Sequence, residues 1–171
     1  MTRSWIIIFL ILAAGLGTAQ WAVASSVTPT SQSPIEQLHR LTDQSSLVVF
    51  GQVSRQTTRY SEDEHFPGQG EIIVTDVDIA VKRVLKGRLT RATVTLVVPG
   101  GCSLEDQRCF MTDIAPSFTD GESVAVFLSL NSRHQWQLSD ILIGKETLEG
   151  GYFRPLGLAR DMLFHHLRRS K

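Results

Sequence analysis

Residues 71–87 read EIIVTDVDIAVKRVLKG, and this stretch decides the fold class. Apolar and polar side chains alternate along most of it, so that one face is apolar and the other carries charges. The apolar face consists of Ile73, Val77, Ile79 and Val81. A period of two residues is typical of a β-strand with one buried face. The sequence therefore predicts a long strand over residues 71–85, which the Lys86-Gly87 pair ends with a turn.

The same alternation recurs on both sides of this stretch. It predicts further strands at residues 46–58, 92–98, 124–130, from 136 onward, and 141–148. Turn residues separate these segments, among them Pro99-Gly100-Gly101 and Asn131-Ser132-Arg133, and Gly150-Gly151 ends the last one. Several short strands at this spacing indicate a mainly β protein. We expect five to six antiparallel strands in a barrel like that of the OB-fold.

A short helix is predicted at each end of this β region. Ser33 can cap a helix over residues 34–44, Pro34 suits the first helical position, and Glu36 completes a capping box. A second helix is predicted over residues 158–168, with its acidic residue early and its basic residues late.

Residues 1–24 have the pattern of a secretory signal peptide. Arg3 precedes an apolar run over residues 5–16, and the small residues Ala22 and Ala24 offer a cleavage site before Ser25. The alternative is an uncleaved membrane anchor, because no charge occurs between Arg3 and Glu36. We expect a secreted or periplasmic protein, with a flexible lead-in at residues 25–33 and one OB-like domain over 34–171.

Composition excludes several classes of partner. The chain has 171 residues, with 17 Lys and Arg against 17 Asp and Glu, so its formal net charge is zero. No overall field would steer it to nucleic acid, and a membrane partner is expected only if the leader stays uncleaved. The sequence contains two cysteines, Cys102 and Cys109. In an oxidising compartment they are expected to form a disulfide that closes a short loop.

The sequence carries no motif of a known catalytic or cofactor site. It has no nucleophile elbow, no zinc-protease helix motif, no phosphate-binding loop and no dinucleotide fingerprint. We therefore expect no catalytic residue, no metal and no cofactor. His65 with its acidic neighbours Glu62, Asp63 and Glu64 could hold a cation, but a solvated loop is the simpler interpretation.

Basic residues gather around the turn after residue 85. They are Lys82, Arg83, Lys86, Arg88 and Arg91. Such a group can attract an acidic protein or an anionic glycan, although an ordinary solvated turn would look the same. Aromatic residues that could share a binding surface are Tyr60, Phe66, Phe110, Phe118 and Trp136. The candidate surface combines the five basic residues with Phe110 and Phe118.

Four segments resemble a known family. Residues 46–53 (SLVVFGQV), 77–87 (VDIAVKRVLKG) and 118–128 (FTDGESVAVFL) are similar to strands of netrin modules and of the tissue metalloproteinase inhibitors, the TIMPs. Residues 98–101 (VPGG) resemble a strand end found in a group of secreted bacterial proteins of unassigned function. The resemblance implies an OB-like fold over roughly residues 45–130.

One feature of the TIMP family has no counterpart in this sequence. TIMPs inhibit their targets with a mature N-terminal cysteine, whereas the expected mature N-terminus here is Ser25. The resemblance therefore implies the fold and not the inhibitory residues. We expect an exported, non-enzymatic binding module with a protein or glycan partner outside the cytoplasm. The alternatives are an inhibitor of a secreted protease that acts through residues 99–118 and a membrane-tethered envelope protein.

Overall fold

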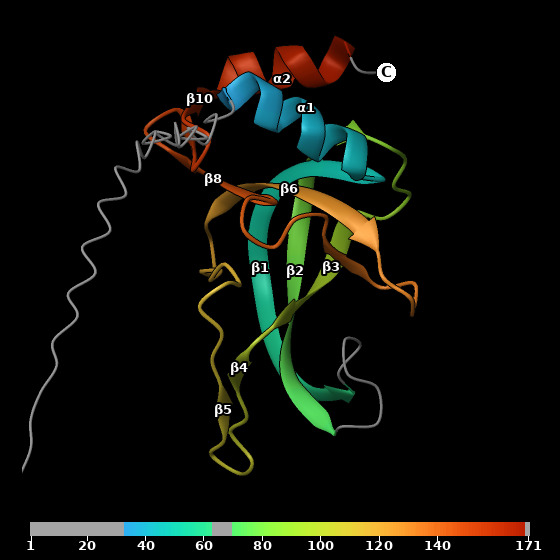
Figure 1. Ribbon diagram of the computed structural model, residues 1–171, viewed down its shortest axis with the longest axis vertical. Helices are drawn as coiled ribbons and strands as arrows, with labels where there is room; N and C mark the ends of the chain where they lie inside the picture. The colour runs from blue at the N-terminus through green and yellow to red at the C-terminus, as the bar shows by residue number, and fades with distance from the viewer. Residues whose placement is uncertain (1–32, 63–69, 170–171) are drawn as a thin grey trace, which may run out of the picture. The chain divides into compact units, whose positions relative to one another are not determined.

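A computed structural model describes residues 33–62 and 70–169 of the chain. Within them the fold is mainly β, with one large sheet, a separate two-stranded ribbon and two short helices (Figure 1). The predicted signal peptide and lead-in lie outside the described residues, apart from Ser33, as do His65 and its neighbours Asp63 and Glu64. Neither described helix is long and apolar enough to cross a membrane.

Two long strands form the spine of the sheet. β1 (Leu47–Glu62) and β2 (Glu71–Lys86) pair antiparallel along nearly their whole length, from Val48 opposite Lys86 to Glu62 opposite Glu71. Gly51 lies where the register shifts, and a Cβ there would be 2.4 Å from the carbonyl oxygen of Ala80. The predicted bend at Gly51 thus coincides with an irregularity of the strand pair. β3 (Thr93–Pro99) extends the sheet by pairing antiparallel with β2.

The second half of the chain brings the sheet back to β1. β6 (Ser123–Leu130) pairs antiparallel with the first part of β1, and β7 (Trp136–Leu138) pairs with β6. β8 (Lys145–Glu149), β9 (Tyr152–Arg154) and β10 (Leu158–Ala159) continue beyond β6. β4 (Gly101–Cys102) and β5 (Cys109–Phe110) form the separate ribbon.

The predicted number and direction of the strands were wrong in part. The main sheet of the described chain has eight strands rather than five or six, because the region after residue 140 folds into three short ones. Gly150-Gly151 ends a strand, as predicted, but the sheet continues: both residues have positive φ and form the tight turn between β8 and β9. β3 and β7 run parallel, and a single residue pair, Leu96 with Trp136, joins them. The sheet therefore curls without forming a closed barrel.

Both faces of β1 are buried, which explains its continuous apolar run. Leu47 and Val49 point into a core between the curled strands, whereas Val48 points into a second core beneath the helices. The helices α1 (Pro34–Gln44) and α2 (Arg160–Arg169) lie side by side over this second core (Figure 1). They contribute four buried leucines: Leu38, Leu41, Leu163 and Leu167.

The predicted helix at residues 34–44 is confirmed together with its cap. The backbone N–H of Glu36 donates to Ser33 Oγ at 3.3 Å, and the N–H of Ser33 donates to Glu36 Oε2 at 2.8 Å. The C-terminal helix begins at Arg160, two residues later than predicted, because Leu158 and Ala159 pair with β9.

Candidate functional site

A polar cleft of about 580 Å³ opens beside β3. Its walls come from β1, β2, β3, the turn after β2 and the hairpin that leads into β7. We call it the arginine cleft, after Arg88 and Arg91 on its wall. Its other polar or aromatic lining residues are Arg59, Asp76, Thr90, Thr93, Thr95, His134, Gln135 and Trp136.

A glycine fixes the turn that carries the two arginines. Gly87 has φ of 82°, and a Cβ at this position would be 2.5 Å from the carbonyl oxygen of Ser46. Only glycine fits this close approach without a shift of the backbone. Leu89, between the two arginines, packs against the core of the curled strands. The turn is therefore anchored by an apolar side chain while Arg88 and Arg91 stay exposed.

The opposite wall is built by a side-chain-stabilised hairpin. Asn131 Oδ1 accepts hydrogen bonds from the backbone N–H of Arg133 at 3.0 Å and of Gln135 at 2.8 Å. Residue His134 between them has a positive φ of 60°. This geometry directs the chain into β7, where Trp136 is half-buried. Trp136 lines the cleft and also packs against the core of the curled strands.

The charges of the cleft leave a positive excess. Arg59 and Asp76 form a bidentate ion pair. Arg59 Nε donates to Asp76 Oδ2 at 2.7 Å, and Arg59 Nη2 donates to Asp76 Oδ1 at 3.0 Å. This pair is neutral as a whole. Arg88 and Arg91 make no ion pair with any residue in the described part of the chain. The cleft thus presents two uncompensated guanidinium groups beside the threonine hydroxyls and an indole ring.

The structure separates the five predicted basic residues into different roles. Lys86 Nζ donates to the backbone carbonyl of Thr42 in α1, and Arg83 lies over the ring of Phe164 in α2, 5.1 Å from its centre. These two side chains fasten the end of β2 to the helices. Lys82 is exposed on β2, and only Arg88 and Arg91 reach the cleft.

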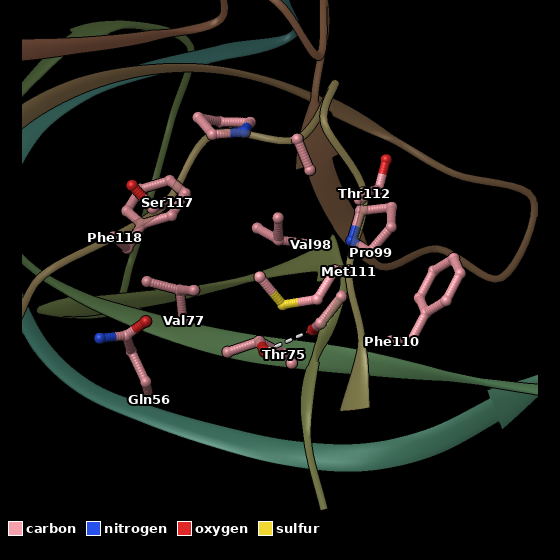
Figure 2. Close-up of a pocket in the computed structure, with 14 residues that line it drawn as sticks. Gln56, Thr75, Val77, Val98, Pro99, Phe110, Met111, Thr112, Ser117 and Phe118 are labelled. Atoms are coloured by element: carbon pink, nitrogen blue, oxygen red, sulfur yellow. Dashed lines mark hydrogen bonds between the residues drawn. The ribbon is translucent and has the colours of Figure 1, made fainter. Parts of the chain in front are cut away.

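Phe110 and Phe118 lie elsewhere, at a second pocket of about 250 Å³ (Figure 2). Lys145 Nζ is 4.5 Å from the centre of the Phe118 ring and also donates to the carbonyl of Ser117. Phe110 points away from the pocket, whereas Met111 extends over it toward Val77 (Figure 2). The predicted surface of basic and aromatic residues is therefore two separate sites.

Some residues of the arginine cleft were not predicted from the sequence. Arg59, His134 and Gln135 come from segments remote from the basic turn, and their types alone mark no site. Trp136 was a candidate by its type, and its pairing with Leu96 explains how β7 brings it to β3.

The predicted disulfide between Cys102 and Cys109 is confirmed. It closes the ribbon of β4 and β5 within residues 99–118, which we call the clasped loop. Tyr60 donates a hydrogen bond to Asp106 at the far end of this loop. That hydrogen bond is the main reason that the pKa of Tyr60 is raised, while hydrogen bonds from Ser103 and then Tyr60 lower the pKa of Asp106.

Another titratable group is buried away from both sites. Glu146 on β8 is fully buried, and desolvation raises the pKa of its carboxyl group to about 7. Glu146 lines neither the arginine cleft nor the pocket beside Phe118, so we assign it a role in the fold. Among the described residues, no group of three or more metal-binding side chains is close enough to hold an ion.

No protein-family model matches the chain, and no curated protein shows significant sequence similarity to it.

Proposed function

We propose that this protein is an exported, non-enzymatic binding module and that its arginine cleft binds an anionic glycan. The observation that carries this proposal is the pairing of two uncompensated arginines with Trp136 in one cleft. Guanidinium groups bind carboxylate and sulfate groups through paired hydrogen bonds. The flat face of an indole ring suits the apolar face of a sugar, and the hydroxyls of Thr90 and Thr93 can bond to its hydroxyl groups.

The order of the strands in the curled sheet supports the position of this site. The pairings run from β1 through β2, β3, β7 and β6 and back to β1, but the parallel β3–β7 step is a single residue pair, so the sheet is curled and not a closed barrel. OB-folds bind oligosaccharides and oligonucleotides on the face of their second and third strands, beside the loop before the fifth. In an OB-fold with β6 and β7 as the fourth and fifth strands, the arginine cleft would occupy the corresponding place. The resemblance to netrin modules and TIMPs points to the same fold.

Export is proposed from the leader at residues 1–24 and from the disulfide. Disulfides persist in oxidising compartments and are rare in the cytosol. A compartment outside the cytoplasm also makes a glycan a more accessible partner than nucleic acid. Inhibition of a secreted protease through the clasped loop, and retention of the leader as an anchor, stay predictions.

Binding to defined oligosaccharides tests the proposal. Isothermal titration of the purified protein with heparin and polygalacturonate oligosaccharides should give saturable binding, and a neutral dextran oligosaccharide should give none. Arg88→Ala with Arg91→Ala should weaken binding by about tenfold or more. Lys82→Ala with Arg108→Ala is the matched control, because it removes two exposed positive charges outside the cleft. Affinity should also fall with added salt.

Two results would contradict the proposal. Equal loss of binding in the double variant and in its control would show that only overall charge matters. Tighter binding of single-stranded oligonucleotides than of every oligosaccharide, with the same dependence on Arg88 and Arg91, would assign the cleft to nucleic acid instead.

A further inference from the structure

The clasped loop presents apolar side chains to solvent. Of the eight exposed large apolar residues in the described chain, four lie within its sequence. Their exposed fractions are 92% for Leu104, 80% for Met111, 57% for Ile114 and 38% for Phe110. Isolated apolar residues are normal on a protein surface, but Phe110 and Met111 lie together on the wall of one pocket, which marks this part of the loop as an interaction site.

The loop is held in place at both of its ends and at its tip. The backbone N–H of Gly100 donates to the carbonyl of Ile73 at 2.9 Å, and Thr75 Oγ1 donates to the carbonyl of Gly100 at 2.7 Å (Figure 2). The disulfide closes the ribbon, Tyr60 binds Asp106 near the tip, and Lys145 binds the carbonyl of Ser117. A segment that is already ordered loses little conformational entropy when it binds a partner.

The pocket beneath the loop has the size of a single side chain. Its volume of about 250 Å³ lies below the usual range for small-molecule sites, about 300–1,000 Å³. Its walls include Val77 and Val98 from the sheet and Ala115 and Phe118 from the loop. A pocket of this kind suits one apolar anchor residue of a protein partner.

The charge of the loop indicates which protein surface fits. Residues 99–118 contain three carboxylates, of Glu105, Asp106 and Asp113, against one guanidinium, of Arg108. The formal charge of the segment is therefore −2. Glu105 and Asp106 lie toward the tip of the loop, and Asp113 follows Thr112 of the pocket wall. The negative charge of the loop as a whole repels anionic membrane surfaces and favours a partner with Lys or Arg beside its apolar anchor.

We propose that the clasped loop and the pocket beneath it bind a protein segment with one large apolar anchor residue flanked by basic residues. The anchor fills the pocket between the loop and β2–β3, beside the exposed Met111 on its wall. The exposed Ile114 lies at a neighbouring pocket that shares Val98 and Pro99 with this one, where it can contact the same partner. Of the three carboxylates, Asp113 is the one next to the pocket in the chain, because it follows Thr112 of the pocket wall, and a basic flank of the partner lies toward it. This site is separate from the arginine cleft and does not depend on the function proposed for it.

Selection from a random 12-residue peptide display library tests the proposal. The protein is immobilised with its disulfide intact, and enriched peptides are synthesised and their affinities measured by fluorescence anisotropy. We expect enrichment of a Leu, Phe or Met anchor with Lys or Arg on both sides. Met111→Ser with Ile114→Ser should weaken these peptides by about tenfold. Met162→Ser is the control, since it removes an exposed methionine on α2 and should leave the affinity unchanged. The helix α2 lies away from the ribbon of β4 and β5 (Figure 1).

The other occupants of the site are distinguished by parallel measurements. Enriched peptides that are acidic, or that bind the double variant as tightly as the unmodified protein, would overturn the proposal. Concentration-dependent dimers that the double variant abolishes would assign the loop to a second copy of the chain. Co-sedimentation with vesicles of phosphatidylcholine and phosphatidylglycerol that is lost in the double variant would assign it to a membrane. Either of these last two results would overturn the proposal as well.

Discussion

Glu146 Oε2 accepts a hydrogen bond from the backbone N–H of Leu156 at 3.0 Å, inside the core beneath the helices. The other carboxylate oxygen, Oε1, has no hydrogen-bond partner among the described residues. An ionised carboxylate in this position lacks solvation, which is why burial raises its pKa from 4.5 to about 7. A protonated carboxyl group fits the site better, so this residue links the stability of the fold to pH.

Stability should fall as the pH rises from about 4.5 to about 7. Below this range Glu146 is protonated in both the folded and the unfolded chain, and above it the group is ionised in both. Between the two values the carboxyl group is ionised in the unfolded chain but still protonated in the folded one. The free energy of unfolding therefore falls across this range, by up to about 3 kcal/mol in all. Urea unfolding at a series of pH values measures this for the unmodified protein and for Glu146→Gln.

The Glu146→Gln variant separates the effect of Glu146 from that of every other titrating group. The difference in the free energy of unfolding between the unmodified protein and Glu146→Gln should change across this range, because all other titrating groups are common to both. A difference that stays constant with pH would show that Glu146 is ionised in the fold.

Gly87 gives a second test, which connects the fold to the arginine cleft. Gly87→Ala should lower the free energy of unfolding by about 1–3 kcal/mol, because φ is positive and the new Cβ would be 2.5 Å from the carbonyl of Ser46. Gly157→Ala is the control: φ is also positive there, at 70°, but no atom lies within 4 Å of the added Cβ. Thermal unfolding should show the larger loss for Gly87→Ala, and equal losses would contradict the close approach.

The alternating stretches of the sequence determined which elements could be predicted. Residues 71–85 and 124–130 have one clear apolar face over many residues, and the structure has β2 and β6 there. β9 and β10 have three and two residues, which is too short for any periodicity to show. Their pairing depends instead on the turn at Gly150-Gly151 and on the packing of Phe153 and Leu158 under the helices.

The candidate site was predictable only in part, for a related reason. Basic residues close in sequence were recognised as a group, but side chains on a turn and on a strand point in several directions. Lys86 and Arg83 reach the helices while Arg88 and Arg91 reach the cleft. The opposite wall comes from residues 134–136, whose position depends on the parallel contact between Leu96 and Trp136. No local pattern specifies such a contact between remote segments.

The disulfide should stabilise the protein by about 2.5 kcal/mol, the value expected for closing a loop of eight residues in the unfolded chain. Replacing both cysteines with serine should lower the midpoint of urea unfolding by the corresponding amount. The same variant should weaken peptide binding at the clasped loop, because the ribbon of β4 and β5 would lose its closure, and leave oligosaccharide binding unchanged. Loss of both kinds of binding would indicate that the two sites are not independent.

The two roles assigned to the basic residues around Gly87 should separate by mutation. Lys86→Met removes a charged hydrogen bond to the carbonyl of Thr42, so it should lower the free energy of unfolding by about 1–2 kcal/mol and leave oligosaccharide affinity unchanged. Arg88→Ala should weaken oligosaccharide binding and leave the free energy of unfolding unchanged, because the Arg88 side chain is exposed and forms no ion pair with the described residues. Urea unfolding and isothermal titration on the same two variants measure both effects. If Lys86→Met weakened binding as much as Arg88→Ala did, the basic residues would act as one charged surface. The assignment of Lys86 to the contact with α1 and of Arg88 to the cleft would then be wrong.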